Sequence, residues 1–519
     1  MFLITALLAV LHGISPASPS DSLVCDSAWV RYARVAWATI GRRSVGALSG
    51  LQWDSIAGDW APVPSGSSAD NAGQAAYEIE PLMRQLLALS QATGDVNGFN
   101  EAARFYNAYE VRFTMVGDLL AEARREGSQS RALPQGDATA RTLKWQDVRS
   151  PTLSWLAECL LCNAQFFHPA ARLIHLIAEL PPPSRTPSMQ SFVKDYVPLI
   201  SKEHLLRVGF DTHFPQYGKV SPDDHLVMLW ERAAKGEINY RYLDRDLWLI
   251  GASAELLEAN RIDPSLVKLP QDQQKLLAKL LTAGAKLLAV NRQHHPDTKD
   301  FQGRVVGSDG YFEGAFDDHA DYTYSAYLGP NYPAGQPAQR ATGVSWDISH
   351  LQRLPVVLRS LWESRATLRE LRIAYPDSSD LVQATNQLLY VVFNRDLRRP
   401  LLTNYFDGND GWYRVNYRSR DGYGFPPSKY CDGQDPKRTC LTRNGIRGWG
   451  MLAFANPDIG KLIEGVIAVA KDSSADATKF RQRVIAMKDD PSEWLSDPPQ
   501  KYSQELSLLI SEYALGTTP

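Results

Sequence analysis

Apolar residues recur every three to four positions through most of the chain, which is the period of an amphipathic helix. Clean alternation of apolar and polar residues is scarce, and its best example is WYRVNYR at 412–418. Long helical segments joined by loops containing proline and glycine indicate an all-α fold. The pattern predicts helices over residues 26–49, 74–93, 98–126, 152–180, 187–206, 222–234, 240–259, 268–291, 346–373, 379–397, 456–471, 475–488 and 502–515.

The helical segments show no short repeat of fixed spacing, which argues against a TPR or HEAT array. Consecutive helices of this size suit helical hairpins closed into an incomplete ring, an α/α toroid with a cleft where the loops at one end meet. Two long loop regions, 292–345 and 398–450, are rich in aromatic residues, and we expect them to cover that cleft. Residues 127–150 are expected to form an exposed linker or lid. The expected cleft walls are residues 205–217, 308–333, 343–354 and 404–447.

The first residues resemble an export signal. An apolar run opens the chain and is too short for a comfortable membrane span. The small residues Ser15 and Ala17 follow it, as they do before a signal-peptide cleavage site. We therefore expect residues 1–17 to be a signal peptide, and residues 18–519 to form a single α/α-toroid catalytic domain of a secreted or periplasmic protein.

Cysteine usage is compatible with export. Cys431 and Cys440 lie nine positions apart in the polar stretch YCDGQDPKRTC, and we expect a disulfide between them. Cys159 and Cys162 form a C-x-x-C inside an apolar helical pattern. No second such pair and no histidine pair follows at zinc-finger spacing, so we expect neither a metal site nor another cofactor.

Charge and aromatic content narrow the range of partners. The formal net charge of −3 gives no general attraction to nucleic acid or to a membrane surface, so neither is an expected partner. The chain contains 13 Trp and 22 Tyr, and such flat amphipathic rings suit a cleft that stacks on sugars, although they also fill cores.

Polar residues lie on the apolar side of the helix predicted at 346–373, within the stretch GVSWDISHLQRLPVVLRSLWES at 343–364. Asp347 and His350 share a face with the apolar positions that follow from Leu351. A polar pair directed at a core must be hydrogen-bonded there or must line a cavity. Two interpretations are open: Asp347 caps the helix and His350 is a satisfied core histidine, or both face a cleft.

Two other stretches bring acidic, histidine and aromatic side chains close together. They are SDGYFEGAFDDHADYTYSAYLGPNYP at 308–333 and LRVGFDTHFPQYGK at 206–219. The first could also be a charged surface loop, and it lacks the ligand spacing of an EF-hand calcium loop. The second could also be a structural helix end. The candidate site residues in these stretches are Asp211, His213, Asp317, Asp318, His319, Tyr322 and Tyr324.

The second long loop indicates the class of substrate. Residues 395–447 contain eleven Lys and Arg against six Asp, a local excess of positive charge in an acidic chain. Arg414 and Arg418 alternate with aromatic residues, among them Trp412 and Tyr417. Arginine forks bind carboxylates and aromatic rings stack on sugar faces, so an acidic polysaccharide is the expected partner. We expect these four residues to contact it.

Several of these features together resemble a known class of enzyme. The helical layout, the export signal, the stretch WDISHLQR with Trp346, Asp347, His350 and Arg353, and the loop DDHADYTY are similar to α/α-toroid polysaccharide lyases and uronyl C5-epimerases of the alginate-lyase type. The resemblance covers residues 205–450. It implies a catalytic cleft that acts on a uronate-containing polysaccharide.

β-Elimination at a uronate needs a donor that neutralises the carboxylate, a base for the C5 proton and an acid for the leaving oxygen. His213, His350 and Arg353 are candidates for the first role. Tyr322 or Tyr324, with a phenol pKa lowered by nearby cations, is the candidate base and acid. Asp347 would orient His350. The expected catalytic residues are thus His213, Tyr322, Tyr324, Asp347 and His350, with Asp211, Asp317, Asp318, His319, Arg353, Trp412, Arg414, Tyr417 and Arg418 binding substrate.

Three alternatives remain open at this point. A uronyl C5-epimerase needs the same groups and returns the proton to the opposite face of the sugar. A glycoside hydrolase on the same fold would use two carboxylates, Asp317 or Asp318 with Asp347 or Asp211. A non-catalytic glycan-binding protein would need the stacking aromatic residues alone.

Overall fold

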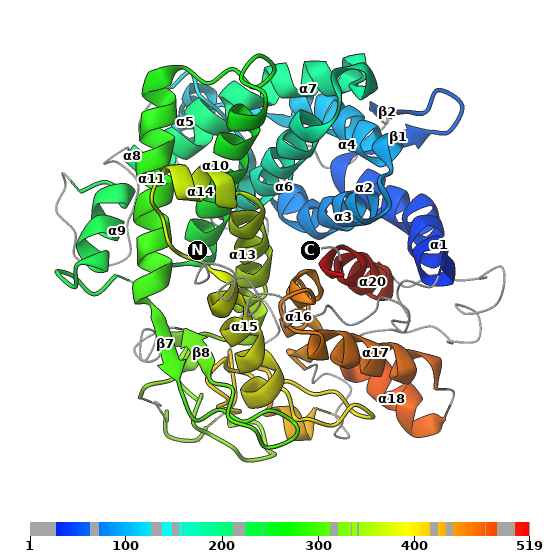
Figure 1. The fold of residues 1–519 in the computed structure, drawn as a ribbon, viewed down its shortest axis with the longest axis vertical. Coiled ribbons are helices and arrows are strands. Elements are labelled where there is room, and N and C mark those ends of the chain that lie inside the picture. The colour runs from blue at the N-terminus through cyan, green and yellow to red at the C-terminus, as the bar shows by residue number, and fades with distance from the viewer. Residues whose placement is uncertain are drawn as a thin grey trace, which may run out of the picture.

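The computed structural model is mainly helical, and its described strands form short two-stranded antiparallel pairs (Figure 1). The expectation of a predominantly helical chain is therefore confirmed. The structure describes residues 27–62, 72–125, 138–147, 155–158, 160–210, 224–240, 242–311, 320–333, 335–339, 342–415, 424–431, 440–472, 474–484 and 504–517.

The helices follow one another along the whole chain. Those before residue 200 are α1 (Ser27–Ala36), η3 (Trp37–Gly41), α2 (Arg42–Ser49), α3 (Ala72–Thr93), α4 (Val96–Tyr109), η5 (Glu110–Arg112), α5 (Val116–Arg125), α6 (Leu160–Glu179), η6 (Pro182–Ser184), α7 (Pro187–Pro198) and η7 (Leu199–Leu206). Next come α8 (Arg207–Phe210), α9 (Leu226–Ala234), α10 (Asp244–Ile262), α11 (Gln271–Val290), η8 (Ala320–Tyr322), α12 (Ile348–Leu351), α13 (Arg353–Glu363), α14 (Arg365–Glu370) and α15 (Ser378–Gln387). The last are η9 (Leu388–Val392), η11 (Ser428–Tyr430), α16 (Thr442–Gly445), η12 (Trp449–Leu452), α17 (Asp458–Lys471), α18 (Ala475–Val484) and α20 (Gln504–Gly516).

The strands pair in sequence order, each with its neighbour along the chain. The pairs are β1 (Leu51–Asp54) with β2 (Asp59–Pro62), β3 (Thr114–Met115) with β4 (Arg141–Thr142), β5 (Lys144–Asp147) with β6 (Trp155–Glu158), and β7 (Arg292–His295) with β8 (Ser308–Tyr311).

Helices α6 and α10 form the centre of the helical core. Residues from Cys162 to Ala178 in α6 and from Arg245 to Asn260 in α10 are all buried. A helix buried on every side must be covered by other helices. α6 and α10 pack against each other, α3 packs on α6, and α13 packs on α10 (Figure 1). α20 lies against α3, so the end of the chain closes one side of this core.

Charged residues inside the helical core are paired across helices. Nη1 of Arg172 lies 3.1 Å from Oε1 of Glu255, which joins α6 to α10. Nε of Arg84 in α3 lies 3.2 Å from Oε1 of Glu512 in α20. An unpaired charge at these depths would be strongly unfavourable, so the pairs restrict how the helices can meet.

Three predicted helices differ from the observed ones. The helix predicted at 98–126 is interrupted after α4 because residues 114–115 pair with β4 before α5 begins. The helix predicted at 152–180 is preceded by β6, which pairs with β5. The helix predicted at 346–373 is divided into α12, α13 and α14. Pro355 accounts for the first division, because it has no N–H to donate to the carbonyl of Leu351.

Two other predictions can be compared with the structure only in part. The strand predicted at 412–418 is reduced to a single bridge between Tyr413 and Phe425, and its residues 416–418 lie outside the described residues. In the expected linker at 127–150, residues 141–147 contain β4 and β5, while 127–137 and 148–150 lie outside the described residues.

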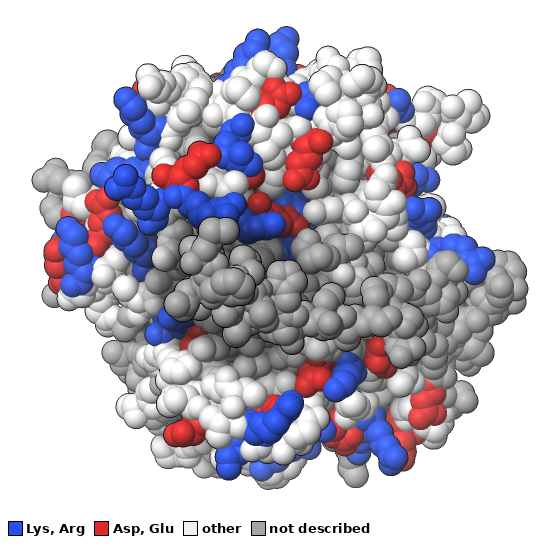
Figure 2. Space-filling model, in the orientation of Figure 1, with Lys and Arg blue, Asp and Glu red and all other residues white. Residues whose placement is uncertain are grey.

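The surface carries both signs of charge. Figure 2 shows Lys and Arg side chains interspersed with Asp and Glu over one face of the described residues, in keeping with the small net charge. Within the part of the chain that is described, no helix is both long and apolar enough to cross a bilayer. The expected signal peptide at 1–17 lies outside the described residues.

Candidate active site

The described parts of the two long loops meet at the start of α12. The backbone of Asp347 forms a bridge with Tyr405, and the backbone N–H of Arg414 donates to the carbonyl of Asp321 (3.1 Å). Segments far apart in the sequence are thereby fixed around one helix end. Of the segments expected to wall a cleft (205–217, 308–333, 343–354 and 404–447), described parts of the last three meet here.

Asp347 caps α12 and holds His350 through the same carboxylate. Its Oδ1 accepts hydrogen bonds from the backbone N–H groups of Ser349 (3.1 Å) and His350 (3.3 Å). Its Oδ2 lies 2.7 Å from Nδ1 of the His350 ring. An aspartate at the N-cap satisfies N–H groups that have no partner within the helix. Capping and orientation of the histidine are therefore two functions of one buried side chain.

Tyr322 fixes the other side of this carboxylate. Its hydroxyl donates to Oδ2 of Asp347 (2.9 Å) and accepts from the backbone N–H of Asp347 (3.1 Å). Burial raises the pKa of the Tyr322 phenol well above its usual range, and the nearby Asp347 charge raises it further. The expectation of a lowered phenol pKa is therefore wrong for Tyr322. A buried phenol beside a carboxylate keeps its proton and acts as a hydrogen-bond donor.

The Asp347 carboxylate stays ionised although it is fully buried. Burial alone would raise its pKa, but the His350 ring, the Arg414 charge and the Ser349 hydroxyl outweigh burial and hold the pKa well below the usual range. An ionised carboxylate that accepts from Nδ1 keeps the proton on that nitrogen.

Arg414 faces the other nitrogen of the His350 ring. Its Nη2 lies 3.3 Å from Nε2 of His350, and its Nε donates to Oδ2 of Asp321 (2.8 Å). A guanidinium can only donate, so Nε2 is the accepting nitrogen. His350 thus presents Nδ1 to the Asp347 carboxylate and Nε2 to the Arg414 guanidinium. The backbone of Arg414 has φ of 55°, which is uncommon for a side chain of this size.

Aromatic rings hold the imidazole in place while leaving one side accessible. The Trp346 indole stacks on the His350 ring with centroids 5.7 Å apart and planes 7° apart. The Tyr413 hydroxyl lies 3.3 Å from Nδ1 of His350. The side chain of His350 is 23% exposed, whereas Asp347 is not exposed at all. His350 is thus the member of the pair that a substrate could reach.

Three other candidate residues have partners that restrict their roles. Trp412 is fully buried and its indole N–H donates to the carbonyl of Gly329 (2.8 Å), so it ties the two loops together. Arg353 is 3% exposed and its Nη2 donates to the Tyr77 hydroxyl (2.6 Å), which places it beneath the helix end. The Tyr324 hydroxyl donates to the carbonyl of Gln336 (3.2 Å) at the surface.

The remaining candidate residues lie outside the described residues, and their predicted roles stay predictions. They are Asp211, His213, Asp317, Asp318, His319, Tyr417 and Arg418. Of the set chosen from the sequence, the structure brings together Tyr322, Asp347, His350 and Arg414.

Sequence reasoning missed two members of this cluster, Asp321 and Tyr413. Asp321 fixes the Arg414 guanidinium, and Tyr413 approaches the ring of His350. Both are next in sequence to residues predicted to belong to the site, so this adjacency could have identified them as candidates. Their partners lie more than 60 positions away, which no local pattern reveals.

The disulfide expected in the second loop is confirmed. Cys431 and Cys440 are bonded, and both are buried. Among the described residues, no group of three or more His, Cys, Asp or Glu side chains could hold a metal ion.

Comparison with known proteins adds no assignment. No family model, no curated protein and no solved structure matches the chain.

Proposed function

We propose that this chain is a secreted α/α-toroid enzyme that cleaves a uronate-containing acidic polysaccharide by β-elimination. The observation that carries the proposal is the contact between Nε2 of His350 and the guanidinium of Arg414, which lie 3.3 Å apart. Removal of a proton next to a carboxylate needs a base together with a cation that neutralises the carboxylate. These two groups are adjacent at the partly exposed end of α12.

Arg414 binds the uronate carboxylate in the first step. A carboxylate is a stronger acceptor than a neutral imidazole, so the guanidinium N–H moves from Nε2 of His350 to the substrate. This movement frees the lone pair on Nε2 and withdraws charge from the uronate. Asp321 keeps hold of Nε and so limits how far Arg414 moves.

His350 takes the C5 proton in the second step. The electron pair of the C5–H bond forms the C4–C5 double bond, and the bond from C4 to the leaving oxygen breaks. The protonated imidazole then returns its proton to that oxygen, so proton and electrons balance. The ionised Asp347 stabilises the imidazolium between these events, as a carboxylate does in other base–orienter pairs.

Tyr322 is a positioning residue in this mechanism and takes the place of the base expected from the sequence. Its hydroxyl holds Oδ2 of Asp347 at 2.9 Å, and its raised pKa makes it a poor base. The proton is instead transferred by His350. The uronyl C5-epimerase alternative would use the same base and the same cation.

The geometry favours elimination over hydrolysis. A glycoside hydrolase needs one carboxyl group that carries a proton for the leaving oxygen. Asp347 is fully buried, is hydrogen-bonded on both oxygens and has a pKa well below the usual range, so it is unsuited to that role. The arginine next to His350 would also have no function on a neutral glycan.

Two features of the fold support the toroid and the export in the proposal. The proposed toroid is supported by contacts between consecutive helices, α3 with α4, α6 with α7 and α10 with α11, as paired helices would make. The disulfide between Cys431 and Cys440 suits an oxidising compartment.

Mass spectrometry of the products tests the proposal. The full chain is incubated with uronate polymers of several kinds and with a neutral glucan as a control. Elimination products are lighter than hydrolysis products by one water, because the new chain end carries a double bond. We expect such products from a uronate polymer and none from the glucan. Hydrolysis products from either polymer would overturn the proposal.

A further inference from the structure

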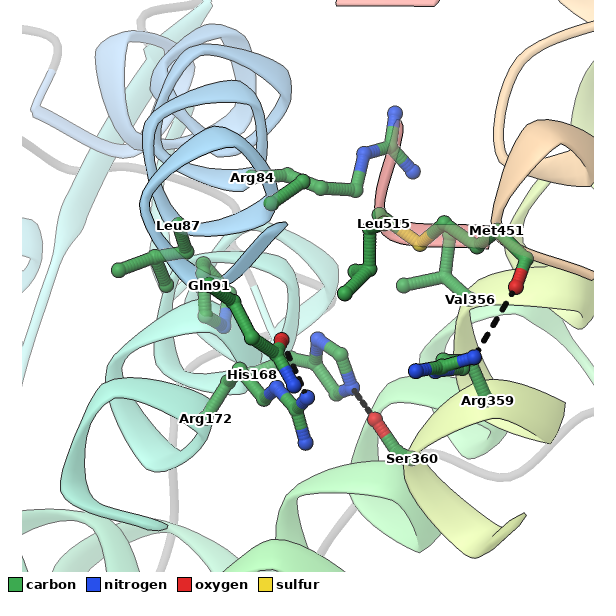
Figure 3. A pocket seen from close by; sticks show the side chains of 12 residues that line it. Arg84, Leu87, Gln91, His168, Arg172, Val356, Arg359, Ser360, Met451 and Leu515 are labelled. Atoms are coloured by element: carbon green, nitrogen blue, oxygen red, sulfur yellow. Dashed lines mark hydrogen bonds between the residues drawn. The ribbon is translucent and has the colours of Figure 1, made fainter. Parts of the chain in front are cut away.

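A small cavity lies inside the helical core, away from the candidate active site. Twelve residues from α3, α6, α13, η12 and α20 line it, and Figure 3 shows how their side chains surround it. Its volume is about 30 Å³, which accommodates a few waters or one small ion. Its lining residues are not those of the candidate active site, so a ligand bound here is distinct from the substrate proposed above.

The lining is positively charged. It contains Arg84, Arg172 and Arg359 and no acidic residue. In Figure 3 the side chains of Arg172, His168 and Arg359 come together along one edge of the cavity. The three arginines and His168 are each at least nine-tenths buried, so solvent screens charges on them poorly.

The carboxylates that balance these arginines lie behind them. Glu363 is shared, because it pairs with Arg172 and its Oε1 also lies 2.6 Å from Nε of Arg359. Glu255 pairs with Arg172 at 3.1 Å and also contacts His175. Neither carboxylate lines the cavity. Arg172 and Arg359 thus share Glu363, Arg172 has Glu255 as a second partner, and only the two arginines line the cavity.

The local electrostatics agree with a positive potential in the cavity. Burial, together with the Arg172 and Arg365 charges, lowers the pKa of Arg359 to about 9. Burial also lowers the pKa of His168 to about 4, with Arg172 and Arg84 adding to the shift against the opposing Glu255 charge. The ring of His168 is fixed by a 3.0 Å hydrogen bond between its Nε2 and Oγ of Ser360. Positive charges repel one another at close range, and an anion bound between them relieves this repulsion.

We propose that this cavity is a binding site for a small monovalent anion of the halide class, held by Arg172 and Arg359. Bound chloride joins α6 to α13 by charge and stabilises the native fold. The site is structural and does not depend on the proposed enzymatic activity.

Thermal unfolding in chloride, with gluconate at equal ionic strength as a control, tests the site in solution. A ligand that binds only the native state raises the unfolding midpoint as its concentration rises. We expect this rise with chloride and bromide, and none with gluconate. An equal response to all three salts would mean ionic-strength screening only and would overturn the proposal.

Variants identify the residues that hold the anion. Arg359→Gln should lose the chloride response. Arg365→Gln should keep it, because this substitution removes one positive charge at a residue that does not line the cavity. Ala88→Leu fills the cavity from α3 without changing any charge, and it tests the site if Arg359→Gln fails to fold. Crystals soaked in bromide should show an anomalous peak between Arg172 and Arg359. Loss of the response in Arg365→Gln, its retention in Ala88→Leu, or the absence of that peak would refute the proposal.

Discussion

Nδ1 of His350 lies 2.7 Å from Oδ2 of Asp347, and the same carboxylate caps the helix from which His350 projects. Orientation of the histidine is therefore built into the start of α12. Both interpretations of this stretch hold in part. Asp347 is the helix cap that the simpler one requires, while His350 is partly exposed and faces Arg414 as a cleft residue would.

Asp347→Asn separates the two functions of the carboxylate. Asparagine caps a helix about as well as aspartate does, so the unfolding midpoint should change little. It cannot stabilise an imidazolium or favour the tautomer with the proton on Nδ1, so kcat should fall by on the order of 10²–10⁴. Steady-state kinetics and thermal unfolding of the same preparation check both. A variant that keeps kcat and unfolds early would show that Asp347 is structural only.

Arg414→Lys tests the role of the guanidinium fork. The charge remains, but one donor replaces the pair that the fork presents to a carboxylate. We expect KM for a uronate polymer to rise by roughly 10-fold or more, since hydrogen bonds to charged groups contribute about 1.5–3 kcal/mol. Arg398→Lys is the matched control, because it makes the same exchange at an exposed arginine of the same loop region. Equal effects of the two variants would exclude a specific contact of the Arg414 fork with the carboxylate.

His168 should make stability depend on pH. Its folded pKa of about 4 lies below the ordinary value of 6.5, so the unfolded chain binds the extra proton as pH falls from 6.5 towards 4. Stability from this group is complete above pH 6.5 and declines across that window by about 1.4 kcal/mol per pH unit. Urea unfolding at several pH values in chloride-free buffer measures the slope. His168→Gln should reduce it, and an unchanged slope would contradict the assignment.

Removal of the disulfide should lower stability without abolishing activity. The bond closes a loop with a sequence separation of nine, for which the chain-entropy model gives about 2–3 kcal/mol. Replacing Cys431 and Cys440 together by Ala avoids leaving a free thiol. Chemical unfolding of the double variant provides the comparison. An unchanged midpoint would show that packing around the two buried sites already fixes this loop.

Periodicity predicted most helices because most of them bury one apolar stripe. It failed where a long-range contact decides the local structure. Residues 155–158 form a strand because β5 pairs with them, and the apolar run alone favours a helix there. Helix α10 was also predicted, although it is buried on every side, because charged residues stand between its apolar positions. In the folded chain these charges are paired, as Glu255 is with Arg172.

The same distinction between local spacing and long-range contacts applies to the candidate site. Asp347 and His350 are three positions apart, so helical spacing alone places them together. The contacts of Asp321 with Arg414 and of Tyr413 with His350 span two loops and depend on the path of the backbone. Loop residues far apart in sequence have no shared period, and only the folded chain shows that they meet.

The ultraviolet absorbance of unsaturated uronide, followed over time for the wild type and His350→Gln on the same uronate polymer, tests the central claim most directly. The side chain of His350 is 23% exposed, so the variant should fold and melt as the wild type does. The account predicts a steady rise in absorbance with the wild type and a rate lower by on the order of 10²–10⁴ with the variant. A folded His350→Gln protein that produces unsaturated uronide at the wild-type rate would contradict it.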